Sequence, residues 1–211
     1  DARIWVPLSP DYWVNRRFEG DASLDKEEMD AYEVGWRSRP RQDLILELSL
    51  YYYDTKDTVL ANPKGQNWYE AQDAESYGGE ISVDYRPADV WLLKGGFSVT
   101  KGKVEGVEKH DFPQLLANLS SHLRLSDAVL FSQNLYYSGP TEIPSDYNPI
   151  TIPSHLRLDL GLIWQPADEW EVGLFGRDLL EPYHVETMFP LVDVEPARVK
   201  RTFILSITKQ F

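Results

Sequence analysis

The chain of 211 residues contains no cysteine, which excludes disulfide bonds, thiolate metal ligands and cysteine nucleophiles. Positive charge is scarce: the formal net charge is −13, which argues against a nucleic-acid partner because phosphate binding needs a basic surface. No segment approaches the roughly 18–20 continuous apolar residues of a membrane-spanning helix. Motifs of serine hydrolases, phosphate loops and zinc proteases are also missing, so we expect neither an enzyme nor a bound cofactor.

What the sequence does contain is an apolar residue at every second position over many short segments. The clearest case is residues 155–164, in which Leu156, Leu158, Leu160, Leu162 and Trp164 fall on one face. Such alternation is typical of strands, and helical spacing occurs almost nowhere. We predict about nine strands of roughly 10–13 residues, near the length that a tilted membrane strand requires. The predicted strands include residues 32–36, 44–52, 81–85, 91–99, 115–125, 129–137, 155–164, 170–174 and 203–211.

Short and long connections alternate along the chain. An up-and-down barrel with short periplasmic turns and long extracellular loops predicts this asymmetry. A Greek-key sandwich does not, because its connections have mixed lengths and cross over. The predicted short turns are residues 39–42, 87–89, 126–127 and 165–168, and the predicted long loops are residues 62–76, 102–112, 139–152 and 182–198.

The polar face of the predicted strands is densely charged, which suits a wet or plugged interior better than a dry core. Aromatic residues lie at the strand ends, where the interfacial girdles of membrane barrels belong. The sequence therefore favours an all-β, antiparallel, up-and-down transmembrane barrel over a soluble β-domain. The charged residues include Glu33, Arg37, Glu47, Glu80, Asp84, Arg86, Arg124, Arg157 and Asp159, and the aromatic ones are Trp36, Tyr52, Tyr85, Trp91, Tyr137, Trp164 and Trp170.

Several segments resemble, in order, the last part of a TonB-dependent outer-membrane receptor. Residues 20–27 are similar to the stretch G-N-x-x-L-x-x-E of that family, and the following residues 32–37 match Y-E-x-G-x-R. Residues 152–159 are similar to I-P-x-x-x-R-x-D. Residues 176–184 are similar to G-x-N-L-L-D-x-x-H, although Asp178 replaces the usual Asn and Glu181 the usual Asp. Residues 3–10 look like the end of a preceding strand, and residues 201–211 resemble the last barrel strand of such receptors.

The resemblance covers essentially the whole chain and implies a barrel of about 22 strands that encloses an N-terminal plug. Such receptors import scarce ligands, such as ferric siderophores, haem or cobalamin, with energy transmitted by TonB. By this resemblance, residues 1–211 are a C-terminal barrel region without the plug and the TonB-contacting segment. The start of the chain lacks a signal-peptide pattern, so we expect a mature chain or a fragment.

The implied location is the outer membrane of a Gram-negative bacterium. The implied partners are membrane lipid and lipopolysaccharide, the remainder of the receptor, a small-molecule ligand, and TonB through the full-length protein only. Acidic loop residues could bridge lipopolysaccharide through divalent cations, although ordinary solvated loops explain them equally well. The alternative is an independent small outer-membrane barrel with a structural or adhesive role, which would have to close on its own.

In receptors of this kind, the inner wall near the outer rim and the long loops contact the ligand. An arginine there could pair with an anionic siderophore, and aromatic rings could stack on catecholate rings. The alternative assigns Tyr51 and Tyr53 to the aromatic girdle and Arg177 to an internal ion-pair ladder. The predicted ligand-binding residues are Tyr51, Tyr53, Glu80 and Arg177 on the wall and Trp68, Tyr69 and Tyr147 in the loops.

The four histidines are not expected to bind a metal, because none has ligands at a spacing that fixes a coordination geometry. His110 and His184 are predicted in solvated extracellular loops. His122 and His155 are predicted on the polar face of strands, hydrogen-bonded to neighbours in the lumen. No motif brings candidate catalytic residues such as Asp146, Asp193 and His184 together.

The last strand carries apolar residues at alternating positions and ends on an aromatic residue. Phe203, Leu205, Ile207 and Phe211 resemble the signal that the outer-membrane assembly machinery reads. Lys209 departs from this pattern, because an aromatic or apolar residue is more usual at its position.

Overall fold

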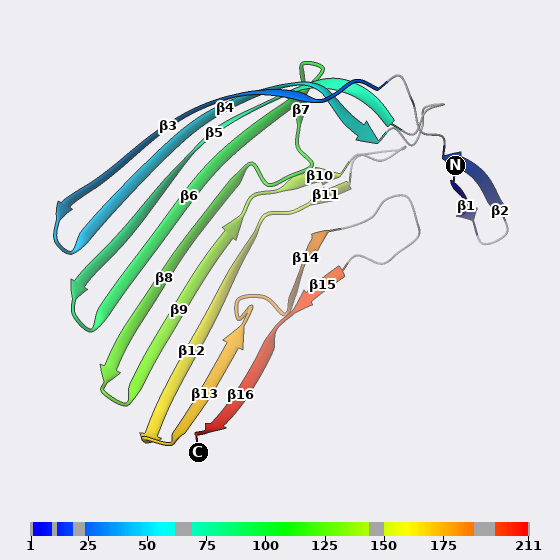
Figure 1. Cartoon of the computed structure of the whole chain (residues 1–211). Coiled ribbons are helices and arrows are strands. Elements are labelled where there is room, and N and C mark those ends of the chain that lie inside the picture. Colours follow the sequence, from blue (N-terminus) through cyan, green and yellow to red (C-terminus); the bar gives the residue numbers. More distant parts are fainter. Residues whose placement is uncertain are drawn as a thin grey trace.

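The computed structural model describes residues 2–9, 12–18, 24–61, 69–143, 150–187 and 197–210. In these ranges the chain forms strands, turns and bends (Figure 1). No helix within them is long and apolar enough to cross a membrane.

Nine long strands form one antiparallel sheet in which neighbours in space are neighbours in the chain. This up-and-down order is the one that the alternation of short and long connections predicts. A short strand, β7 (Val107–Lys109), adds to the end of β6. In spatial order the nine strands are β3 (Glu28–Arg41), β4 (Leu44–Ala61), β5 (Tyr69–Ala88), β6 (Trp91–Val104), β8 (Leu115–Ser126), β9 (Val129–Ser138), β12 (His155–Ala167), β13 (Trp170–Arg177) and β16 (Thr202–Lys209).

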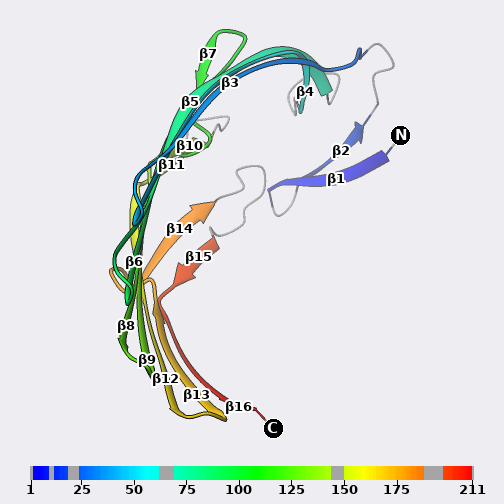
Figure 2. The same cartoon turned by 60° about the vertical axis from the view of Figure 1, so that its left-hand side comes forward.

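Three further strand pairs stand apart from this sheet. They are β1 (Ala2–Ser9) with β2 (Tyr12–Phe18), β10 (Thr141–Ile143) with β11 (Ile150–Ile152), and β14 (Tyr183–Thr187) with β15 (Ala197–Lys200). The β14–β15 hairpin leaves the sheet on its concave side (Figure 2).

The predicted long loops are partly strand. Strands β10 and β11 lie within residues 139–152, β14 lies within residues 182–198, and residues 69–76 already belong to β5. Many of these residues are polar. Strands that rise into water have no apolar face to bury, so the alternation that reveals a strand in a sequence is absent from them.

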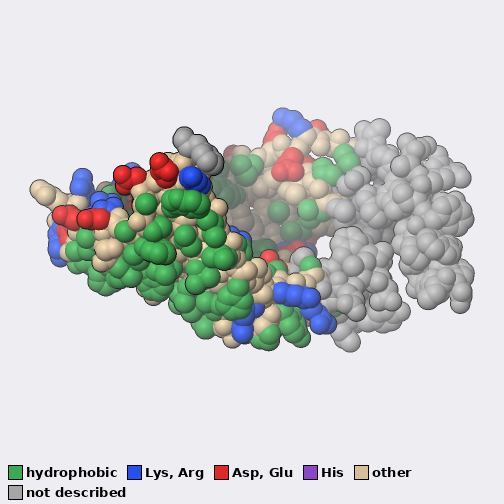
Figure 3. Space-filling view, turned by 90° about the horizontal axis from the view of Figure 1, so that it is seen from below, with side chains coloured by type: hydrophobic (Ala, Val, Ile, Leu, Met, Phe, Trp, Pro, Cys, Tyr) green, Lys and Arg blue, Asp and Glu red, His purple; other side chains and the backbone are tan. Residues whose placement is uncertain are grey.

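The strand register gathers the alternating apolar residues on one side, which we call the outer face. Val34 lies opposite Leu50, and Leu48 lies opposite Ile81. These side chains are exposed, Leu50 by 51% and Val34 by 69%, and hydrophobic side chains cover a continuous area bordered by charged ones (Figure 3). A soluble protein rarely exposes so large an apolar surface, so this face needs a cover of lipid or protein.

Aromatic side chains lie near both ends of the outer face, as the sequence predicts for interfacial girdles. Tyr32 and Tyr52 pair across β3 and β4 with ring centroids 6.3 Å apart. By register, the outer-face aromatic residues nearer the short turns are Trp36, Tyr85, Trp91, Trp164 and Trp170, and those nearer the long connections are Tyr32, Tyr52, Tyr77 and Tyr137.

Gln133 interrupts the alternation of β9 in the sequence, and the structure explains how a polar residue fits the outer face there. Gln133 lies opposite Ser121 of β8. The indole Nε1 of Trp91 donates a hydrogen bond to Ser121 Oγ at 3.0 Å. The residue opposite Gln133 is thus also polar and is bonded to Trp91, while Gln133 itself is the middle one of the outer-face positions of β9.

The opposite side of the sheet, which we call the inner face, carries charges that pair across neighbouring strands. Arg37 Nε lies 3.1 Å from Glu47 Oε1, and Ser82 Oγ donates to the other oxygen of Glu47 at 3.1 Å. Lys94 Nζ pairs with Asp84 at 3.0 Å. The polar face that the sequence predicts to be charged thus carries exposed ion pairs between neighbouring strands, which suits a water-filled interior.

Proline marks three of the four short turns, and each of these prolines lies in a bulge. The register shifts between Ser38 and Arg41, between Tyr85 and Ala88, and between Trp164 and Ala167. Proline has no N–H to give to a strand ladder, so it is tolerated where the ladder is already interrupted. The strands therefore continue past Pro40, Pro87 and Pro166, and the turns follow one to three residues later than predicted.

The nine strands form a curved wall with two free edges. In the part of the chain that the structure describes, β3 and β16 each pair with a single neighbour. These strands do not close into a small barrel, and their arrangement fits a sector of a larger one. On β16 the predicted assembly residues Phe203, Leu205 and Ile207 lie on the outer face, while Lys209 lies over the Trp170 ring at 5.3 Å. Phe211 lies outside the described residues.

Candidate functional site

The first candidate site is on the inner face, where two tyrosines of β4 stack on each other. The rings of Tyr51 and Tyr53 have centroids 5.2 Å apart at an angle of 21°. Tyr51 Oη shares a hydrogen bond of 2.5 Å with Thr100 Oγ1 of β6, and Tyr53 Oη donates to Glu33 Oε1 of β3 at 2.5 Å. We call these four residues, together with Glu80, the tyrosine cluster.

A glycine on the neighbouring strand leaves room for the Tyr51 ring. Gly78 of β5 lies directly opposite Tyr51. A Cβ at Gly78 would lie 2.2 Å from the backbone oxygen of Val99 and 2.5 Å from Tyr51 Oη. The absence of a side chain therefore lets the ring extend across β5 to reach Thr100, an arrangement in which an aromatic ring covers a cross-strand glycine.

The tyrosine cluster offers two parallel aromatic faces, and Glu80 lies on the same face of β5, between Ser49 of β4 and Ser98 of β6. The prediction that Tyr51, Tyr53 and Glu80 face inward is confirmed. The alternative that Tyr51 and Tyr53 belong to the girdle is wrong, because the girdle lies on the outer face and takes Tyr52 instead. A role in ligand binding stays a prediction.

The other predicted binding residues are not part of this cluster. Arg177 faces inward but lies on β13, five strands beyond β5 in the sheet, where its charge acts on Asp159. Tyr69 begins β5, and its side chain is outside the described part. Trp68 and Tyr147 lie outside the described residues.

The second candidate site joins the start of β12 to β14, and we call it the histidine cluster: His155, His184, Glu186, Asp178 and Asp159. His184 Nδ1 lies 2.8 Å from Asp178 Oδ2, and His184 Nε2 lies 2.9 Å from Glu186 Oε1. The rings of His155 and His184 are stacked with centroids 4.2 Å apart. The cluster therefore links the hairpin to β12 of the barrel wall through side-chain contacts.

Asp178 is the centre of the histidine cluster and is only 2% exposed. Its backbone N–H donates a hydrogen bond to Asp159 Oδ1 at 2.9 Å, and the Asp159 carboxylate in turn accepts two hydrogen bonds from the Arg157 guanidinium. Asp178 has a φ of 54°, a left-handed conformation that asparagine and aspartate tolerate best among non-glycine residues. This explains why Asp can occupy the position where the resemblance expects Asn.

His184 is buried, 6% exposed, so the prediction that it lies in a solvated loop is wrong. Hairpin β14–β15 stands outside the nine-stranded sheet. Burial would lower the pKa of His184, but hydrogen bonds with Glu186 and Asp178 outweigh burial and raise it. His184 therefore lies between two carboxylates, one at each ring nitrogen.

The remaining histidines agree better with expectation. His122 Nδ1 hydrogen-bonds Ser132 Oγ at 3.2 Å on the inner face, and His110 is exposed beside Gln114. His155 lies on the inner face as predicted, yet its Nδ1 is buried and has no hydrogen-bond partner among the described residues. Sequence reasoning missed the histidine cluster because its two halves, 155–159 and 178–186, are separate motifs in the chain.

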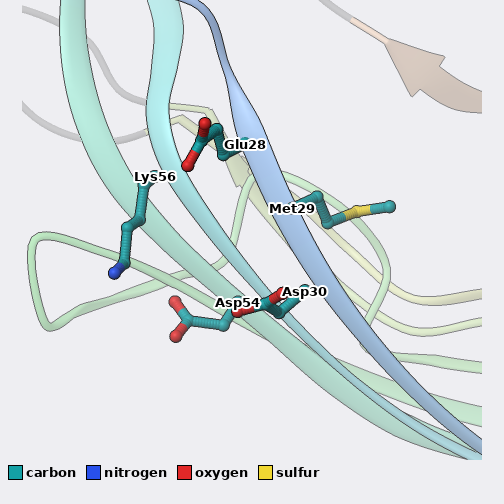
Figure 4. Close-up of a pocket in the computed structure, with 5 residues that line it drawn as sticks. All are labelled: Glu28, Met29, Asp30, Asp54 and Lys56. Atoms are coloured by element: carbon teal, nitrogen blue, oxygen red, sulfur yellow. The ribbon is translucent and has the colours of Figure 1, made fainter.

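A shallow depression of about 370 Å³ lies between β3 and β4 (Figure 4). Glu28 faces Lys56 across the two strands, and Asp30 faces Asp54. By register these residues follow Tyr32 and Tyr52 on the outer face, beyond the aromatic girdle. The depression therefore faces the membrane surface and is separate from both inner-face clusters.

Comparison with known proteins identifies the family. A family model described as TonB dependent receptor-like, β-barrel matches residues 5–179. No curated protein matches the sequence.

Solved structures share the fold. The ferric-catecholate import receptor Fiu of Escherichia coli K12 is 17% identical with a TM-score of 0.73, over 99% of this chain and 32% of that one. The ferripyoverdine receptor of Pseudomonas aeruginosa is 15% identical with a TM-score of 0.76, over 99% and 30%. The ferric yersiniabactin uptake receptor FyuA of Yersinia pestis is 20% identical with a TM-score of 0.70, over 88% and 30%.

The chain thus spans about a third of the length of these structures. The matched family is one of outer-membrane receptors and not of enzymes, in agreement with the expectation that the chain carries no catalytic site. The apolar outer face, the charged inner face and the family match agree, and the chain belongs to the TonB-dependent receptor β-barrel family.

Proposed function

We propose that this chain is the C-terminal barrel sector of an outer-membrane receptor that imports a scarce ligand, of the ferric siderophore class, with energy from TonB. The family match over residues 5–179 carries the proposal. The structural relatives named above are described as siderophore receptors, which favours this ligand class over haem or cobalamin. The plug, the TonB-contacting segment and the other strands would belong to the rest of the receptor.

The proposed location is the outer membrane of a Gram-negative bacterium, with lipid against the outer face. The free edges of β3 and β16 would pair with the remaining strands, since an unpaired edge is not tolerated in lipid. Beyond the girdle, the acidic residues Glu28, Asp30 and Asp54 would lie at the height of the lipopolysaccharide head groups.

The direct test is uptake of radioactive iron by iron-starved cells that lack or carry the receptor. The probes are a purified hydroxamate, a catecholate and a mixed-ligand ferric siderophore, each given separately. We expect deletion to abolish uptake of at least one probe and restoration of the gene to recover it. Unchanged uptake of all three, with normal uptake of haem and cobalamin, would refute import as the function.

The tyrosine cluster supplies the proposed contact surface for the ligand. We expect Tyr51→Ala and Tyr53→Ala each to weaken binding of the imported probe about tenfold, because loss of a stacked ring removes on the order of 1 kcal/mol. Tyr52→Ala is the matched control, because Tyr52 lies between them in the chain but faces outward. Equal affinities of all three variants in a titration of purified receptor would show that the ligand does not bind at this cluster.

The orientation of the sheet in the membrane has its own test. We expect Leu50→Arg to destabilise the folded barrel by about 2–4 kcal/mol, because it places a charge on the lipid-facing side. Ser49→Arg, one residue away on the inner face, should cost much less. Urea unfolding of the receptor in lipid vesicles measures both. A larger loss for Ser49→Arg would mean that the two faces are assigned the wrong way round.

A further inference from the structure

We propose that His155, His184 and Glu186 bind one divalent transition-metal ion, of which Zn²⁺ is the simplest probe, between β12 and β14. One ligand atom from each side chain lies within 4.8 Å of the others. Two imidazoles and a carboxylate are a donor set that Zn²⁺ and related first-row ions bind, and they leave a coordination position open for water. The site is separate from the tyrosine cluster and does not depend on ligand import.

The surroundings of His184 are those of a metal-binding histidine. Such a histidine usually donates its other ring N–H to a carboxylate, which fixes the ring and strengthens the metal bond. His184 Nδ1 has this contact with the buried Asp178, so His184 Nε2 is the nitrogen that points toward Glu186. With Nδ1 protonated toward Asp178, Nε2 carries the lone pair, and this lone pair and the Glu186 carboxylate would both turn to the ion.

One proposed ligand has a buried polar atom without a partner. Three buried side-chain polar atoms have no hydrogen-bond partner among the described residues, and His155 Nδ1 is one of them. Buried polar atoms in folded proteins are nearly always satisfied, so such an atom calls for an explanation. The His155 ring is therefore not committed at Nδ1, and this nitrogen is available to an ion.

Binding requires the two rings to leave their stack. Ligands of a tetrahedral zinc ion lie about 3.3 Å apart, given bonds of about 2.0–2.1 Å, so ligand atoms that now lie up to 4.8 Å apart would approach by up to about 1.5 Å. The imidazoles, now 17° from parallel, would also rotate until both lone pairs point at the ion. Hairpin β14–β15 can supply this movement because, in the described part of the chain, its strands pair with each other and not with the nine-stranded sheet, with a register shift next to Glu186. The bound ion would then tie the hairpin to the barrel wall.

The test measures Zn²⁺ binding to the whole receptor, extracted from outer membranes in detergent and stripped with a chelator. We compare His155→Gln, Glu186→Gln and His184→Gln with the wild type by competition against a chromophoric chelator. His122→Gln is the matched control, since His122 lies on the same face but outside the histidine cluster, where it hydrogen-bonds Ser132. We expect the wild type and the control to bind one more ion than His155→Gln and His184→Gln, and Glu186→Gln to bind it at least tenfold more weakly.

A folding check keeps the result interpretable, because His184 is buried. Each variant is tested for the gel shift on boiling that a folded barrel gives. If His184→Gln fails this check, the other two variants decide, as Glu186 is half exposed and its loss should not prevent folding. Bound Co²⁺ should give visible absorption bands in the wild type and lose them in Glu186→Gln. Equal Zn²⁺ binding by the wild type, His155→Gln and Glu186→Gln would overturn the site and leave the uptake results untouched.

Discussion

Asp178→Val should destabilise the barrel sector by about 3–5 kcal/mol, because it breaks the buried pair between Asp178 and the His184 ring and leaves His184 Nδ1 without its partner. The substitution also places a β-branched residue at a φ of 54°, where an L side chain meets the following carbonyl oxygen. The receptor should lose its compact gel form at a clearly lower temperature than the wild type. Solvent cannot compensate for the loss, since Asp178 is 2% exposed.

Asp178→Asn is the matched control, since asparagine tolerates the same backbone conformation and its side-chain oxygen can accept from His184 Nδ1. We expect Asp178→Asn to lie within about 1 kcal/mol of the wild type, as is usual for a change that keeps the hydrogen bond. If Asp178→Val and Asp178→Asn melted alike, the hydrogen-bonded network around His184 would have no part in stability.

Gly78→Val should have a comparably large effect at the tyrosine cluster. Its Cβ would lie 2.2 Å from the backbone oxygen of Val99, so β5 and β6 must separate locally and Tyr51 must leave Thr100. Backbone displacement of this kind belongs to the rare substitutions that cost more than about 4 kcal/mol. Little folded receptor should reach the outer membrane, as measured by the gel shift of membrane extracts.

Gly35→Val is the matched control on the same face. A Cβ at Gly35 would meet only the backbone oxygen of Leu48, at 4.0 Å, and valine is favoured in strands. We expect Gly35→Val to assemble at the wild-type level. Normal assembly of Gly78→Val would mean that the Tyr51 ring does not lie across β5.

The strands of the membrane wall could be predicted well because lipid imposes a strict pattern. Leu48, Leu50 and Ile81 must all face one side, and a shift of one residue would turn every one of them to the other side. In the proposed orientation, the parts of β4 and β5 beyond the aromatic girdle, residues 55–61 and 69–74, would face water on both sides. No alternation is required there, so a sequence of polar residues reads as a loop although it forms a strand.

The two inner-face clusters differ in how far they could be predicted. Tyr51 and Tyr53 are two residues apart on one strand, so their shared face follows from the period of a strand. His155 and His184 meet only because β14 folds back over the start of β12 after leaving β13. Such a contact depends on the path of a hairpin in space, and neither local spacing nor alternation encodes it.

The unequal lengths of the strands give the wall a sloping upper rim. β5 has 20 residues and β16 has 8, which at about 3.3 Å per residue correspond to about 66 Å and 26 Å. In the proposed orientation a spanning strand needs only about 9–11 residues, so the β4–β5 side would rise far above the bilayer while β13 and β16 would end near its surface. A ligand that approaches from the medium would then meet a tall wall on one side and, on the other, a lower rim with the β14–β15 hairpin above it.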